Sequence, residues 1–422
     1  MQIFLQNSTI WGDEGAEKTN TNLYIKDGVI TAIGQGLDVP EGVKVLKGLV
    51  VCPGWLDLGV QVGEPGWEVI EDLKSVAMAA AHGGFTCIAA QPNTSPVRQG
   101  KSEILFLTQN APVGPVQMIP LGAVSEGCAG RDLTEMMDMH QCGALGFTDG
   151  LHPIADAGLM MRALQYIKSF DGLILNYPLD NSIGRDGLIH EGIISTSLGL
   201  KGIPSLSEEM MVHRDIELVK YTNSRLHING VSSAGSVDLI RKAKAEGVRI
   251  TASVPVLNLV FTVDQMTEFD STYKVLPPLR EKRDQMALWE GLKDGTIDGI
   301  ISNHVPVEQE KKKLEFPYAA FGASTIESVY PLLQSLAPVP ITPQEWVKWL
   351  SAGPRKVLHL PSINISVGEQ ANLTLLDPTE STWRLPEDFF SKSKNIPELN
   401  RSLQGNVVGV IHQNQIQIFN QL

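Results

Sequence analysis

The middle of the chain alternates short apolar strands with amphipathic or alanine-rich stretches, and this alternation constrains the fold more than any other feature. Helical stretches such as residues 69–84, 236–247 and 283–295 close on Gly, as a helix C-cap often does. Eight parallel strands with helical crossovers in about 250 residues are typical of a (β/α)8 TIM-type barrel, so we predict an α/β fold of that kind. The eight expected strands lie at residues 55–62, 85–91, 116–123, 144–149, 172–178, 225–231, 248–256 and 298–304.

Strand-like segments also occur at both ends of the chain. The first 52 residues read as short strands separated by turns, and Asp27-Gly28 is a hairpin signal. Strand patterns return after Pro361, at residues 371–377 and 406–419. Neither group is long enough to stand alone. We therefore predict that residues 1–52 and 361–422 form one small β-sandwich domain beside a barrel of residues 53–360.

Composition excludes several classes of function. The formal net charge is −13 and is spread along the chain, which disfavours nucleic acid and anionic membrane as partners. The first ten residues lack the features of a signal peptide, and no apolar run approaches the length of a membrane span. The four cysteines are scattered without C-x-x-C spacing. We expect a cytoplasmic protein with reduced thiols.

The active site of such a barrel lies at the carboxyl ends of its strands, and the first strand end is unusual. Asp57, Gly59 and Gln61 alternate along this strand and face the same side. In metal-dependent hydrolases of barrel type, this place carries Asp-x-His-x-His, whose two imidazoles grip one metal. Here a glycine and a glutamine stand in place of the two imidazoles.

The remaining strand ends are polar but mostly neutral. A zinc site needs three or four ligands drawn from imidazole, thiolate and carboxylate, and glycines and carboxamides do not supply them. The nine histidines are dispersed, and no two are spaced as a ligand pair. The residues at the later strand ends are Asn93, Asp149, Asn176, His227, Gly230, Asn303, His304 and Val307.

Several longer stretches together resemble the dihydroorotase family of the amidohydrolase superfamily, of the bacterial class related to the barrel part of multifunctional pyrimidine enzymes. The resemblance covers nearly the whole chain and is specific through the combination of its motifs. They include PGWLDLGVQVGEPG at 53–66, AAQPNTSPV at 89–97, GALGFTDG at 143–150, the run at 198–218, the stretch from RLHINGV at 225, residues 273–307 and GEQANLTLLDP at 368–378.

The resemblance also implies which residues should do the chemistry, and this chain departs from the family there. Family members carry zinc-binding histidines at the positions of Gly59, Gln61, Asn176 and Gly230, a substrate-binding arginine at Gly63, an aspartate that is both metal ligand and general base at Asn303, and a substrate-binding histidine at Val307. The matching positions are Asp57, Asn93, Asp149, His227 and His304. Of the expected zinc ligands only Asp149 survives, and its acidic neighbour has become Gly150.

These departures bear directly on the family reaction. Opening a cyclic amide requires a hydroxide made at neutral pH by a metal, and a carboxylate that moves the proton. A carboxamide at Asn303 does not titrate. We therefore predict no catalytic residue, no metal and no cofactor, as in the non-catalytic dihydroorotase-like members of the family. The resemblance implies a structural role in pyrimidine biosynthesis with aspartate carbamoyltransferase as partner, and we expect a homo-oligomer.

Other interpretations stay open from the sequence. The chain could be an active cyclic-amide hydrolase, of dihydroorotase or hydantoinase type, with an atypical metal site, or a small-molecule sensor with a neutral pocket. Single residues also have structural readings: a backbone hydrogen bond for Asp57, a turn for Asn93, and a hydrogen-bonded core position for His227 and His304. An atypical metal site would have to be assembled from Asp57, Asp149, Asp180, His227 and His304.

Overall fold

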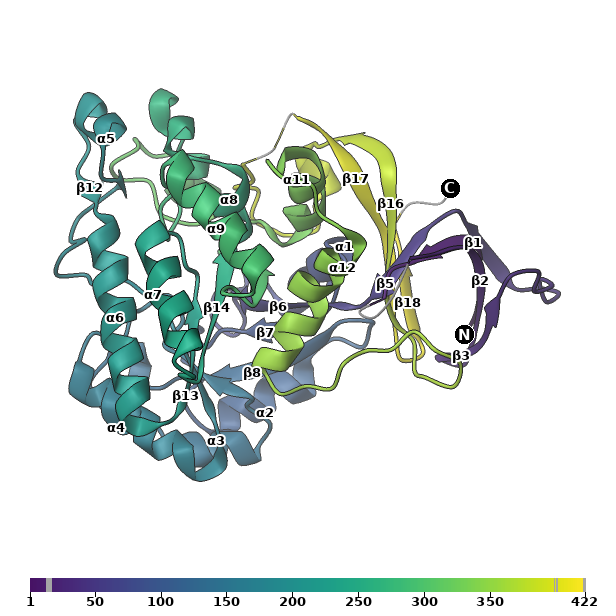
Figure 1. Cartoon of the computed structure of the whole chain (residues 1–422), viewed down its shortest axis with the longest axis horizontal. Coiled ribbons are helices and arrows are strands. Elements are labelled where there is room, and N and C mark those ends of the chain that lie inside the picture. The colour runs from purple at the N-terminus through teal and green to yellow at the C-terminus, as the bar shows by residue number, and fades with distance from the viewer. Residues whose placement is uncertain (13–16, 398, 400, 420–422) are drawn as a thin grey trace.

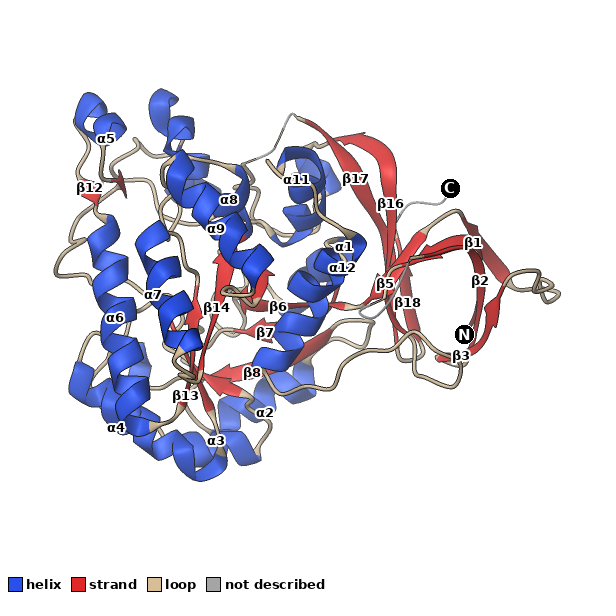
Figure 2. Ribbon diagram, viewed as in Figure 1, coloured by secondary structure: helices blue, strands red, loops and turns tan. Residues whose placement is uncertain are grey.

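A parallel barrel forms the larger part of the protein, in a computed structural model that describes residues 1–12, 17–397, 399 and 401–419 (Figures 1 and 2). Its strands pair in sequence order from β6 to β15. Val60 bridges His304 just beyond β15, which brings the last strand back to the first. The barrel strands are β6 Trp55–Val60, β7 Phe85–Ala90, β8 Gln117–Gly122, β9 Gly146–Phe147, β10 Leu173–Asn176, β13 Arg225–Asn229, β14 Ile250–Pro255 and β15 Gly299–Ile301.

Helices cover the outside of the barrel, as Figure 2 shows, and confirm the predicted (β/α)8 architecture. Two very short strands, β11 Ile189–His190 and β12 Gly202–Ile203, pair in the excursion that follows β10. The helices are α1 Leu73–His82, α2 Lys101–Asn110, α3 Met136–Gln141, α4 Ala157–Ile167, α5 Ile193–Leu198, α6 Ser205–Thr222, α7 Ala234–Ala245, α8 Val256–Val260, α9 Lys282–Asp294, α10 Gln309–Lys312, α11 Val329–Leu336, α12 Pro343–Val347 and α13 Gly353–Val357.

The first barrel helix starts later than the apolar pattern suggested. Asp72 caps α1 by accepting a hydrogen bond from the Ser75 amide at 2.7 Å, and the Ser75 hydroxyl accepts one from the Asp72 amide at 3.0 Å. This reciprocal capping box fixes the first helical residue at Leu73. Residues 69–72 therefore belong to the loop that follows β6, and Glu71 can turn into the interior.

Strands from both ends of the chain share one eight-stranded sheet, as predicted, and form a small β domain (Figure 1). The antiparallel pairing of β16 with β5 joins the C-terminal strands to the N-terminal ones. Side chains from both groups, such as Leu5 and Leu373, lie in one buried cluster, so the sheet folds over around a common core. The strands are β1 Gln2–Ile10, β2 Lys18–Lys26, β3 Val29–Gly34, β4 Lys44–Lys47, β5 Val50–Pro53, β16 Asn372–Trp383, β17 Ser402–His412 and β18 Gln415–Ile418.

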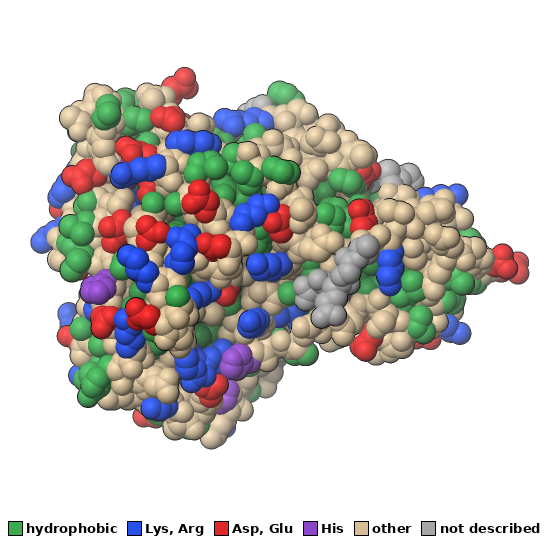
Figure 3. Space-filling model, in the orientation of Figure 1, with side chains coloured by type: hydrophobic (Ala, Val, Ile, Leu, Met, Phe, Trp, Pro, Cys, Tyr) green, Lys and Arg blue, Asp and Glu red, His purple; other side chains and the backbone are tan. Residues whose placement is uncertain are grey.

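The surface gives two further observations. On the face drawn in Figure 3, acidic and basic side chains are interspersed over the helical part of the molecule. Within the described part of the chain, no helix combines the length and apolar character needed to cross a bilayer.

Trp55, at the start of β6, packs the barrel against the helices that follow β15. Its side chain is fully buried and lies stacked on Trp346, with ring centroids 6.3 Å apart and planes 13° apart. Phe85 and Tyr330 lie at 5.9 and 5.8 Å from the same ring. Aromatic clusters of this kind combine a large buried apolar area with favourable ring contacts.

We predict that Trp55→Ala lowers the free energy of unfolding by about 3–5 kcal/mol, because it removes buried area and leaves a cavity. Urea unfolding followed by far-UV circular dichroism measures the change. The matched control is Trp383→Ala, since Trp383 is 55% exposed and should matter little. Similar losses in the two variants would contradict this description of the core.

Candidate functional site at the barrel mouth

Asp57 ties the first barrel strand to the last one. Its side chain is fully buried, with Oδ1 accepting from the Gly59 amide at 3.0 Å and Oδ2 from the Ser302 amide at 3.1 Å. Burial raises the pKa of Asp57, although the hydrogen bonds from Ser302 and Gly59 oppose that shift. The carboxylate therefore accepts hydrogen bonds from the backbone at two strand ends.

A chain of carboxamides occupies the place where the family resemblance expects metal ligands. Gln61 Nε2 donates to Gln91 Oε1 at 2.6 Å and to Asn93 Oδ1 at 3.0 Å. Asn93 Nδ2 in turn donates to the main-chain oxygen of Asp149 at 3.0 Å. Hydrogen bonds between neutral groups thus join the ends of β6, β7 and β9.

Asp149 keeps its carboxylate but uses it for local structure. Oδ1 accepts from the amides of Val124 and Ser125 at 3.0 and 2.9 Å, and Oδ2 contacts the Ser125 hydroxyl. Burial raises the pKa of Asp149, against the effect of the Ser125 and Val124 hydrogen bonds. Both oxygens are therefore satisfied by the loop that follows β8.

Two asparagines replace further expected ligands, and both are held by neighbouring groups. Asn176 Nδ2 donates to Asp215 Oδ2 at 2.6 Å, and its Oδ1 accepts from the Ile154 amide at 3.2 Å. Asn303 Nδ2 donates to the main-chain oxygen of Leu276 at 2.9 Å. Each side chain is engaged in positioning a loop at the mouth.

His227 is a fully buried histidine between two hydroxyls. Its Nδ1 lies 2.9 Å from Thr251 Oγ1 and its Nε2 lies 3.0 Å from Ser253 Oγ. Burial lowers its pKa to about 3, so the ring is neutral at pH 7. With both nitrogens engaged, His227 acts as a hydrogen-bonded core side chain.

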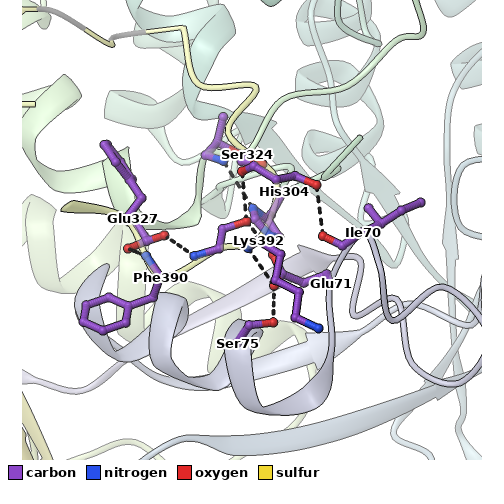
Figure 4. Close-up of polar contacts among 12 residues, drawn as sticks. Ile70, Glu71, Ser75, His304, Ser324, Glu327, Phe390 and Lys392 are labelled. Carbon is purple, nitrogen blue, oxygen red and sulfur yellow. Dashed lines mark hydrogen bonds and ion pairs between the residues drawn. The ribbon is translucent and has the colours of Figure 1, made fainter. Parts of the chain in front are cut away.

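His304 contacts a carboxylate that the sequence pattern did not single out, Glu71. His304 Nε2 lies 3.5 Å from Glu71 Oε2, and its Nδ1 accepts from the Thr325 amide at 3.2 Å. Figure 4 shows Glu71, Ser75 and His304 gathered at this point. The hydroxyl of Ser391 also contacts Glu71. This contact attaches the C-terminal segment of residues 391–395 to the barrel mouth.

Burial would raise the pKa of Glu71, but His304 and the serine hydroxyls outweigh it and hold that pKa below its usual range. The sequence did not indicate a role for Glu71, because the apolar pattern of residues 69–84 predicted that this residue lies within a helix. The Asp72-x-x-Ser75 capping signal would have placed it just before the helix instead.

Two glycines at the mouth, Gly63 and Gly150, lie so close to neighbouring groups that a side chain would collide with them. A Cβ at Gly63, where φ is +72°, would lie 2.2 Å from the main-chain oxygen of Glu71. A Cβ at Gly150 would lie 1.7 Å from Asn93 Oδ1. At Gly59 the nearest atom, Ile301 Cδ1, is 3.2 Å away. The positions of the expected arginine and of the second acidic residue are thus filled by neighbouring groups.

The two remaining positions differ from each other. Gly230 has a φ of +101°, and the atoms nearest to a Cβ there belong to Pro255 and Pro277, each at 3.7 Å. Val307 is buried, and its amide donates to Asn395 Oδ1 at 3.3 Å. Asn395 belongs to the same C-terminal segment that contacts Glu71. This segment therefore also fixes the loop after β15.

These residues do not fit a zinc ion at the mouth. Zinc needs free imidazole, thiolate or carboxylate groups, and the carboxylates of Asp57 and Asp149 are committed to the backbone. The atypical set is not assembled either, since among the described residues no three of its members lie at metal-ligand spacing. Among the residues that the structure describes, the cluster with metal-ligand spacing lies elsewhere, in the outer loops, and consists of His190, Glu281 and Asp284.

We predict that Gly63→Ala destabilises the protein more than Gly36→Ala does. Both glycines have φ near +70°, but a Cβ at Gly36 meets nothing within 4 Å. Gly36→Ala should cost about 1–2 kcal/mol for its backbone conformation. Gly63→Ala should cost roughly 1–3 kcal/mol more, because the Glu71 loop must move. Equal decreases in the free energy of unfolding, measured with urea, would contradict this prediction, because they would show that the Glu71 loop moves without cost.

We also predict that His227 makes the fold sensitive to acid. Its pKa is about 3 in the folded state and 6.5 when unfolded, so between these values the unfolded chain binds the extra proton and stability falls as pH falls. Between pH 7 and pH 5 the loss is about 2 kcal/mol. Over this interval the free energy of unfolding of His227→Gln should fall by about 2 kcal/mol less than that of the parent protein. The control His213→Gln, at an exposed position, should show the same pH dependence as the parent protein. Parallel pH profiles for all three proteins would contradict a buried neutral His227.

The amino-acid sequence is similar to those of known proteins over most of its length. A family profile described as Dihydro-orotase-like matches residues 48–236. A protein of Pelotomaculum thermopropionicum named dihydroorotase is 39% identical over 409 residues, covering 96% of each chain. One of Syntrophus aciditrophicus with the same name is 38% identical over 422 residues, covering 99% of each chain.

Solved structures share the fold at lower sequence identity. The L-hydantoinase (dihydropyrimidinase) of Arthrobacter aurescens superimposes with a TM-score of 0.82 at 22% identity, covering 99% of this chain and 97% of the other. The dihydropyrimidinase of Brevibacillus agri gives 0.82 at 20% identity, covering 100% and 95%. With identity of this extent to full-length relatives, the chain belongs to the dihydroorotase family.

Proposed function

We propose that this chain is a dihydroorotase-family protein that no longer hydrolyses cyclic amides and that serves pyrimidine biosynthesis as a structural partner of aspartate carbamoyltransferase. One observation carries the loss of activity. The strand ends that the family resemblance assigns to zinc chemistry hold neutral carboxamides and glycines, and the surviving Asp149 has both oxygens bound by the loop after β8. Hydrogen bonds among Gln61, Gln91 and Asn93 join the neighbouring ends of β6 and β7.

The chemistry of the reaction supports the same proposal. Hydrolysis of a cyclic amide needs a nucleophilic hydroxide and a group that carries a proton from it to the leaving nitrogen. Asn303 stands where the family resemblance places that group, and its amide donates to Leu276. Neither His227 nor Asp57 replaces it, because the hydrogen-bonding atoms of both are engaged inside the barrel.

We predict that the purified chain shows no hydrolysis of dihydroorotate above the uncatalysed rate, even with added zinc. The loss of absorbance of the amide substrate measures the rate, and the Pelotomaculum relative named dihydroorotase serves as the positive control. Turnover that disappears in Asp149→Asn would contradict the proposal, because it would show that Asp149 supports a working site. The same assay covers the alternative of an active hydrolase with atypical ligands.

The partner proposal rests on the family resemblance. We expect the chain alone to elute as a homo-oligomer, above its mass of 46.0 kDa, in size-exclusion chromatography with light scattering. Mixed with the carbamoyltransferase of its own organism, it should co-elute and raise the temperature at which the transferase loses activity. Separate elution, together with a transferase that is equally stable and active alone, would contradict a structural role.

A further inference from the structure

Three potential metal ligands converge in the outer loops, on the side of the barrel where β10 and β14 end. His190 lies on β11, Glu281 directly precedes α9, and Asp284 lies in its first turn. One ligand atom from each lies within 4.8 Å of the others. We propose that His190, Glu281 and Asp284 bind a divalent transition-metal cation of the zinc type, at a site separate from the barrel mouth.

The buried carboxylate of Asp284 is the strongest support for a ligand. The residue is 2% exposed, and its Oδ1 accepts from the Ala234 amide at 2.9 Å. Its Oδ2 is buried and makes no hydrogen bond with any described residue. The nearest cation is Arg283, 3.9 Å away and 73% exposed, and such a pair contributes little. A buried oxygen without a hydrogen bond is costly, and a bound cation would satisfy it.

His190 has the properties of an imidazole ligand. It is 3% exposed and is fixed by the pairing of β11 with β12. Metals bind the neutral imidazole, and zinc accepts nitrogen and carboxylate ligands together.

Three positive side chains oppose a cation at this place. Lys282 lines the same pocket, and Arg283 Nε lies 3.4 Å from Glu281 Oε2, although the side chain of Arg283 is 73% exposed.

The third positive side chain, Arg280, is buried. Its charge is balanced by Glu208, with Nη2 3.1 Å from Oε2 in a buried pair. Its Nη1 lies 3.2 Å from His190 Nδ1 and 3.1 Å from Ser205 Oγ, so the serine can take this donor. A metal on His190 Nε2 requires the ring proton to lie on Nδ1, with Arg280 Nη1 then donating to Ser205 Oγ alone.

The site is reached through a pocket of about 350 Å³. His190 and Glu281 line it, together with the carboxylate residue Asp264 and the apolar residues Ile193 and Val263. The side chain of Glu281 is 41% exposed, so the cluster faces this opening. Water molecules can supply the remaining coordination positions from the pocket.

The two acidic residues also have a simpler role, because negative charge near the start of α9 favours its dipole. That role requires neither His190 nor an Asp284 oxygen without a hydrogen bond. Zinc binding by single-residue variants therefore separates the two explanations.

The test titrates Zn²⁺ into the full-length, chelator-stripped protein at pH 7.5 against a fluorescent zinc chelator. We expect one zinc per chain. We also expect an affinity about tenfold or more weaker in His190→Ala and in Glu281→Gln. His213→Ala is the matched control, because this histidine is exposed on α6, and its affinity should be unchanged.

Asp149→Asn separates this site from the barrel mouth and should also bind zinc normally. Absence of binding, unchanged affinity in both site variants, or loss of binding in Asp149→Asn would overturn the proposal. If His190→Ala fails to fold, Glu281→Gln alone tests the proposal, because the side chain of Glu281 is 41% exposed and its substitution should leave the fold intact. The result is independent of the proposed loss of hydrolysis, since zinc binding without turnover satisfies both proposals.

Discussion

Two buried carboxylates hold the barrel mouth together by accepting main-chain amides, and the chemistry of the mouth depends on that commitment. Asp57 joins β6 to the segment after β15, and Asp149 fixes the loop that follows β8. A carboxylate that accepts several amide hydrogen bonds is a structural support, because leaving those buried amides unpaired is costly. The oxygens of both acids are therefore occupied by hydrogen bonds at the strand ends.

The neutral side chains around these carboxylates complete the same arrangement. Gln61 and Asn93 join neighbouring strand ends through carboxamides, which donate and accept hydrogen bonds but do not titrate. Gly63 and Gly150 allow neighbouring atoms to approach so closely that a side chain would collide with them. The space beside Gly63 and Gly150 is thus occupied by neighbouring groups, in a chain that keeps 39% identity with a relative named dihydroorotase.

The sequence predicted the barrel and the neutral character of its mouth, because eight strand patterns and the identities of Gln61 and Asn303 can be read directly. It did not predict which groups fill the space, since the approach of the Glu71 carbonyl to Gly63 depends on the path of a loop. It also missed the cluster of His190 with Glu281, because residues about ninety positions apart meet only through the excursions after β10 and β14. Contacts of this kind arise from tertiary structure, whereas strand periodicity is local.

Anomalous diffraction tests most directly whether the barrel mouth forms a metal site. Crystals of the full-length protein grown with excess zinc would be measured on both sides of the zinc absorption edge. We predict no anomalous peak within coordination distance of Gln61, Asp149 or Asn176, whatever zinc binds elsewhere on the molecule. A well-occupied peak ligated by Asp149 at the mouth would contradict the account.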